Sequence, residues 1–215
     1  NFKVPPWDRS PLPPATLKTV VAFGNLALAG FVLSAGAVRF AFPAVSLEGK
    51  AFWILQTAPM SLSTLLWSKL WLNLVPLLIL GELLVFLSNL LLQVPSWMMI
   101  LSLATVFLMT CGITAISVGV GALYPKFAFD HAAEIPTSFG GAICMILSIA
   151  FIGIAVMIEA WPIYFLTMRG MNPGRSVAPA FWVLAPSLVG VIVLTLGAVV
   201  TSIKLGLRNL EQLKE

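Results

Sequence analysis

Residues 83–125 read LLVFLSNLLLQVPSWMMILSLATVFLMTCGITAISVGVGALYP and contain no charged side chain. One membrane-spanning helix needs about 20 apolar residues, so this run is too long for a single helix. The segment Gln93-Val94-Pro95-Ser96 interrupts the run with a proline, which is typical of a turn between helices. The stretch therefore predicts two antiparallel transmembrane helices joined by a short hairpin.

The composition of the whole chain favours a membrane protein. Its 215 residues are 60% hydrophobic and 9% charged, whereas a soluble domain carries about 25% charged residues. A protein of this size has too much surface to hide so many apolar residues. We therefore predict an all-α integral membrane protein and exclude a soluble enzyme and a nucleic-acid-binding protein. The five predicted transmembrane helices lie at about residues 18–42, 70–93, 97–123, 139–161 and 180–204.

The positive charges predict the orientation of these helices. Five helices place the two ends of the chain on opposite sides of the membrane, and the side richer in Lys and Arg faces the cytoplasm. The loop at 162–179 carries only Arg169 and Arg175. The opposite side carries Arg39, Lys50, Lys69, Lys126, Lys204, Arg208 and Lys214. This pattern predicts a bacterial cytoplasmic membrane protein with its C-terminal tail, residues 206–215, in the cytoplasm.

A short segment at 46–58 has the pattern of an amphipathic helix. Ser46 can cap its start, and Glu48 in the first turn suits the positive end of the helix dipole. One apolar stripe is formed by Leu47, Ala51, Ile54, Leu55 and Ala58. Two interpretations are open: a helix that anchors the chain at the membrane surface, or a helix that docks a soluble partner.

Polar residues inside the predicted helices are candidates for a transport path. Glu82 lies near the middle of the second helix, with Asn89 at i+7 on the same face. Two interpretations are open: polar residues that line a substrate path or the interface of a dimer, or an interior carboxyl that is hydrogen-bonded. The third helix carries Thr110, Thr114, Ser117 and Gly121 in one stripe. That stripe favours close helix packing, with path lining as the alternative.

The remaining chemical groups predict no catalytic or metal site. Glu159 lies beside Trp161 and Tyr164, so we interpret it as part of an anchor at the outer membrane interface. The single histidine, His131, is too little for a metal site. Cys111 and Cys144 both lie inside apolar runs and are interpreted as packing residues.

Two segments resemble a known family. The first consists of Glu48, then FWILQTAPMS at 52–61 and WSK at 67–69; the second consists of YPKFAFD at 124–130 and AEIPTSFGG at 133–141. They resemble the permease subunits of type-2 ATP-binding-cassette (ABC) exporters, and the second is similar to one exporter subfamily. With the helix layout, the resemblance covers most of residues 20–205.

The resemblance implies a layout and a function. A permease domain at 18–205 would hold a coupling helix at 46–58 and an external segment at 162–179. The family has six spans, so the chain is expected to be a C-terminal portion without the first span, preceded by an extended proline-rich lead-in at 1–17. Its partners would be an ABC ATPase subunit, a second permease copy or half, and lipid, but no nucleic acid. The ATPase is expected to dock at Glu48, Lys50, Phe52, Trp53, Gln56, Lys126 and Asp130.

The phosphate-binding pattern G-x-x-x-x-G-K-[ST] does not occur in the 215 residues. We therefore predict that the chain is not an enzyme and binds no cofactor directly. ATP and Mg would be bound by a separate ATPase subunit, whose hydrolysis drives export through this chain. The alternatives are an ion-coupled secondary transporter and a membrane scaffold without transport activity.

Overall fold

The structure, a computed structural model, describes residues 14–51, 61–94, 96–126, 131–170 and 180–212. Within these ranges all regular structure is helical, which confirms the all-α prediction. Five helices are long and apolar enough to cross a membrane. The elements are α1 Pro14–Phe40, η2 Phe42–Ala44, η3 Ser46–Ala51, α3 Leu62–Leu92, α4 Ser96–Leu123, η4 Ala132–Glu134, α5 Phe139–Gly170 and α6 Ala180–Gln212.

Several helices extend beyond the predicted spans. Helix α3 begins at Leu62, where the Ser61 side chain accepts a hydrogen bond from the Thr64 N–H, and α6 continues to Gln212. Helix α1 begins at Pro14, within the predicted lead-in, of which residues 1–13 lie outside the described ranges. The differences arise because hydropathy marks only the apolar middle of each helix, whereas backbone hydrogen bonding continues into polar ends.

The predicted amphipathic helix at 46–58 has a different form where it is described. Residues Ser46–Ala51 form a short 3-10 helix, η3, and residues 52–58 lie outside the described ranges. The Ser46 side chain is buried, and its hydroxyl accepts a hydrogen bond from the distant Lys126 N–H at 3.1 Å. Ser46 therefore makes a tertiary contact where we predicted a helix cap.

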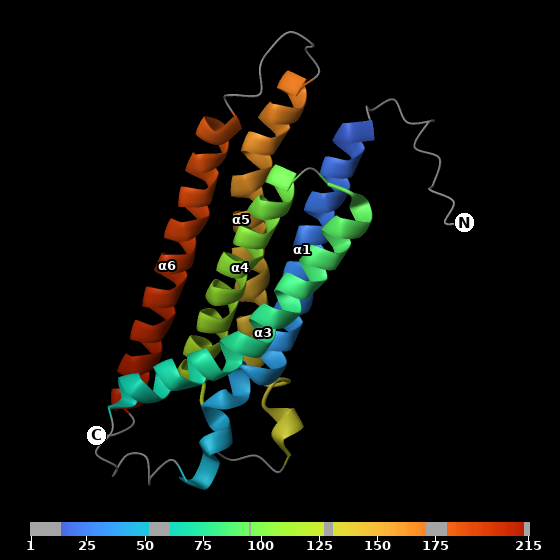
Figure 1. Ribbon diagram of the computed structural model, residues 1–215. Coiled ribbons are helices and arrows are strands. Elements are labelled where there is room, and N and C mark those ends of the chain that lie inside the picture. Colours follow the sequence, from blue (N-terminus) through green and yellow to red (C-terminus); the bar gives the residue numbers. More distant parts are fainter. Residues whose placement is uncertain (1–13, 52–60, 95, 127–130, 171–179, 213–215) are drawn as a thin grey trace.

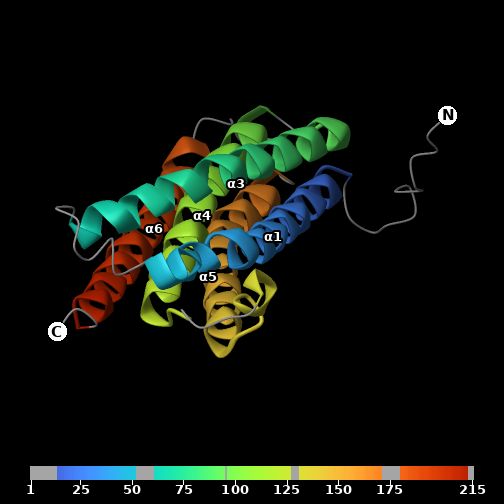
Figure 2. The ribbon, with the colours of Figure 1, turned by 90° about the horizontal axis from the view of Figure 1, so that it is seen from below.

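Helix α4 lies at the centre of the bundle. It contacts α1, α3, α5 and α6, and the view from below places it among them (Figure 2). Within its most apolar window 61% is buried, against 17% to 39% for the other four long helices. The outward faces of the four surrounding helices carry many exposed apolar side chains, such as Leu72, Leu91 and Met157. Such faces are solvated by lipid, as in a membrane-spanning bundle.

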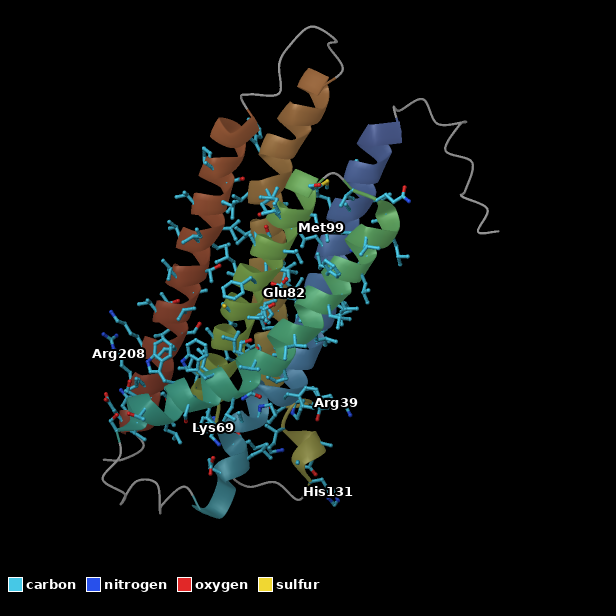
Figure 3. All side chains as sticks on the ribbon, viewed as in Figure 1. Arg39, Lys69, Glu82, Met99, His131 and Arg208 are labelled. Carbon is cyan, nitrogen blue, oxygen red and sulfur yellow. The ribbon has the colours of Figure 1, made fainter. Side chains whose placement is uncertain are left out.

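The two ends of the bundle differ. Helix α1 begins at one end and α6 finishes at the other, while α3 crosses the remaining helices obliquely (Figure 1). We call the end at which α6 finishes the basal end. It also holds η2, η3 and η4, and the side chains of Arg39, Lys69, His131 and Arg208 lie there (Figure 3).

Close backbone contacts hold the basal half of α4. A Cβ added at Gly121 would lie 2.2 Å from the Phe42 carbonyl oxygen, and one at Gly119 would lie 2.6 Å from the Ser202 carbonyl oxygen. Neither position has room for a side chain, because backbone atoms cannot rotate away. Small residues at such positions allow helices in membranes to approach closely.

Replacing Gly121 by alanine should therefore destabilise the protein, by about 1–3 kcal/mol as for other overpacked positions. Thermal unfolding of the purified protein in detergent measures the effect. The matched control is Gly153→Ala, because a Cβ at Gly153 meets nothing within 4 Å. Equal melting temperatures for the two variants would contradict the packing assigned to Gly121.

Candidate functional site

The predicted functional residues that are described fall into two regions. One is a set of polar side chains at the basal end, and the other is a set of polar groups inside the bundle. We call the first the basal cluster, and it consists of Ser46, Glu48, Lys69, Lys126, Glu134 and Asn209.

An ion pair joins η3 to α3 in the basal cluster. The Lys69 ammonium group contacts the Glu48 carboxylate, and the two side chains are 21% and 26% exposed. Partial burial strengthens such a pair relative to one on an open surface. Both residues belong to the first segment quoted for the family resemblance, but their pairing was not predicted from the sequence.

Four further contacts join other parts of the basal end. The hydroxyl of Ser46 accepts a hydrogen bond from the Lys126 N–H, and the Lys126 ammonium group lies 3.4 Å from the Glu134 carboxylate. The Asn209 side chain of α6 donates to the carbonyls of Ala122 and Leu123 at 3.0 and 3.1 Å. The last carbonyls of a helix lack partners within that helix, so Asn209 satisfies the end of α4. The basal cluster thus ties η3 to α3 and to the segment after α4, and it separately ties α6 to the end of α4.

The structure describes only part of the predicted docking set. Glu48 and Lys126 lie in the basal cluster, and Lys50 belongs to η3. The remaining members, Phe52, Trp53, Gln56 and Asp130, lie outside the described ranges. Next to the cluster, a cavity of about 580 Å³ separates the end of α1 from the η4 segment, with Arg39 on its wall.

Inside the bundle, Asn89 links α3 to α4. Its side-chain amide donates to the Ser102 hydroxyl, which lies 2.9 Å from the Met98 carbonyl oxygen, and both side chains are buried. Glu82, which shares the predicted face with Asn89, is half-buried near the middle of α3 (Figure 3). The two residues therefore differ in environment, with Asn89 in the interior and Glu82 at its edge.

The predicted stripe on α4 is buried along its length. The hydroxyls of Thr110 and Thr114 donate to carbonyls one turn earlier in α4, each at 2.7 Å. The Ser117 hydroxyl accepts a weak bond from the Cys144 thiol of α5 at 3.3 Å. Because these groups bond α4 itself or a neighbouring helix, the stripe adds no free polar surface to the interior.

Sequence reasoning missed Glu159. We interpreted it as an interfacial anchor, but its side chain is 1% exposed and accepts a hydrogen bond from the Thr105 hydroxyl of α4. Its neighbour Trp161 is 78% exposed and faces outward. A signal was present, because Ser148, Ile152, Ala155 and Glu159 share the spacing of one buried helix face.

A protein-family model described as "Putative ATP-binding cassette" matches residues 9–214. Among curated proteins and among solved structures, no match to the chain was found.

The family match overturns three predictions. The chain is not identified as an exporter permease; its function is not that of a permease driven by a separate ATPase; and the statement that it is no enzyme fails. The two alternatives, an ion-coupled transporter and a scaffold, are set aside with them. The family is described as an ATP-binding cassette, which points to the ATP-binding part of such a system.

The errors have physical reasons. The two segments behind the resemblance are short and rich in proline, serine and aromatic residues, which are common wherever a membrane helix meets water. The absence of one glycine-rich loop pattern was also too weak an argument, since helix N-termini and turns of backbone N–H groups hold phosphates as well.

The ion pair in the basal cluster gives a test. Replacing Glu48 by lysine should destabilise the protein by about 1 kcal/mol or more, because two cations then lie together. The double variant E48K/K69E should recover most of that loss, as measured by thermal unfolding in detergent. Glu211→Lys is the matched control, since Glu211 is exposed near the end of α6. If the double variant is destabilised by as much as Glu48→Lys and Lys69→Glu added together, the pair contributes nothing to stability.

Proposed function

We propose a role in ATP-dependent membrane transport, because the chain belongs to the family described as "Putative ATP-binding cassette". The family match over residues 9–214 is the observation that carries this proposal, since it includes all five long apolar helices. The chain would work inside the membrane, together with the other components of an ABC transport system.

The basal end faces the cytoplasm in this proposal. Arg39, Lys69 and Arg208 lie there (Figure 3). Lys126 belongs to the basal cluster, and Lys204 lies two turns before the end of α6. Basic residues favour the cytoplasmic side of a bacterial membrane. ATP is bound and hydrolysed in the cytoplasm, so movements that accompany its hydrolysis can act on the basal cluster directly.

Movement would enter the bundle through the basal cluster. A shift of η3 or the η4 segment acts on α3 through Glu48 and Lys69, and on the end of α4 through Lys126. Helix α4 contacts the other four long helices, so it passes a displacement to all of them. Packed helices respond to such a displacement as rigid bodies, with small rotations and shifts.

Single-cysteine variants test the orientation. His131→Cys at η4 and Ser96→Cys at the start of α4 are both exposed positions at opposite ends of the bundle. With Cys111 and Cys144 replaced by alanine, an impermeant maleimide should label position 96 in intact cells and position 131 only in inverted vesicles. The reverse pattern would contradict a cytoplasmic basal end.

The transport role is tested on the full-length protein purified from its own membranes in mild detergent, with the proteins that accompany it. This preparation should hydrolyse ATP, and a photoreactive azido-ATP should identify the polypeptide that binds the nucleotide. Glu48→Lys should lower hydrolysis severalfold, whereas Glu211→Lys should leave it unchanged. A preparation that neither binds nor hydrolyses ATP would overturn the proposed function.

A further inference from the structure

We propose that Glu159 is a proton-binding site inside the bundle, between α1, α4 and α5, with a single water molecule beside it. This inference is independent of the proposed transport role. It rests on the burial of one carboxyl group, on an oxygen with no hydrogen-bond partner among the described residues, and on a small cavity that Glu159 lines.

Glu159 lies well inside the apolar part of the bundle. Its first carboxyl oxygen, Oε1, accepts the hydrogen bond from Thr105, which is about 14 Å from the start of α4 at 1.5 Å per residue. Its second oxygen, Oε2, is buried and has no hydrogen-bond partner among the described residues. A buried polar atom of this kind requires an explanation, because an unmade hydrogen bond in an apolar medium is costly.

A cavity next to Glu159 offers the missing partner. Its volume is about 10 Å³, which is enough for one water molecule. The wall is apolar except for Glu159 and Ser102, and α1 contributes Ala22, Phe23 and Leu26. Polar groups of α4 and α5 therefore line this cavity, and the one from α4, Ser102, also accepts the hydrogen bond from Asn89 of α3.

Few charged or titratable groups lie on the helices around Glu159. Sequence range 96–123 of α4 and range 180–203 of α6 contain no charged residue, and the cysteine Cys111 is their only titratable group. On α3 the charged residues are Lys69 and Glu82. On α5, range 139–161 adds only Cys144 to Glu159, and Tyr164 and Arg169 follow in the last turns. On α1, Lys18 precedes Ala22 by one turn, and the Lys18 side chain is not among those that the structure describes.

The oxygens around the cavity are also too few for a metal. A calcium ion takes about 6–8 oxygen ligands, whereas the cavity wall offers the Glu159 carboxyl and the Ser102 hydroxyl. An ionised carboxylate without a partner is expensive within a membrane, and binding a proton removes that charge. The proton arrives as hydronium, passes from the cavity water to Oε2 and leaves a neutral water behind; release is the reverse.

Carbodiimide labelling tests this site in native membranes that contain the full chain. Dicyclohexylcarbodiimide adds to a protonated carboxyl in an apolar environment and forms a stable N-acylurea, with no leaving group. Mass spectrometry should find the adduct on Glu159, with less adduct as the pH is raised. Glu159→Gln should lose this adduct, and Glu82→Gln should retain it.

Three outcomes would overturn the proposal. Glu159 could remain unlabelled at every pH in a sample where Glu82 or another carboxyl reacts. Labelling could be independent of pH, which would mean that no proton is exchanged. Labelling could also require Lys18→Met, which would identify Glu159 as a carboxylate paired with Lys18. Each outcome is separate from the tests of ATP hydrolysis, which do not depend on Glu159.

Discussion

Backbone contact along α4 is the constraint on which the rest of the bundle depends. Gly121 lies against the Phe42 carbonyl, and Gly119 lies against the backbone at Ser202. In a membrane, helices gain little from leaving the solvent, because lipid tails are as apolar as the side chains; close packing has to hold them together. The approach of η2 and α6 to α4 therefore fixes where the basal elements lie, and the basal cluster is built on that arrangement.

Polar groups in the interior follow from the same constraint. Where α4 touches its neighbours closely, hydroxyls such as Thr110 and Thr114 are satisfied by α4 itself. Farther toward the opposite end the packing leaves a small cavity that Glu159 lines. The two ends of α4 thus differ: backbone contacts hold it near the basal end, and a small cavity lies beside it near the other end.

The sequence predicted the helices well because hydrophobicity alone determines where a chain can cross lipid. The uncharged run at 83–125 gave the hairpin between α3 and α4, and the structure has those two helices with Gln93 in the turn. Contacts between distant segments were not predictable in the same way. Ser46 bonds Lys126 and Asn209 bonds the end of α4 across more than 75 positions, and no local pattern specifies such pairs. Glu159 was misread because its position next to Trp161 outweighed the buried face that it shares with Ala155.

A movement driven by ATP at the basal cluster would reach α3 and α4 by different contacts. A shift that begins at Glu48 and Lys69 can reach α3 directly, since that pair connects η3 to α3. The same shift reaches α4 through the Ser46–Lys126 hydrogen bond and through η2, which lies against Gly121. Because α4 is held by backbone contact on two sides, it resists bending and moves as one body. A displacement of α4 therefore also changes the packing around Glu159, because Met98, Leu101 and Ser102 of α4 line the cavity beside it.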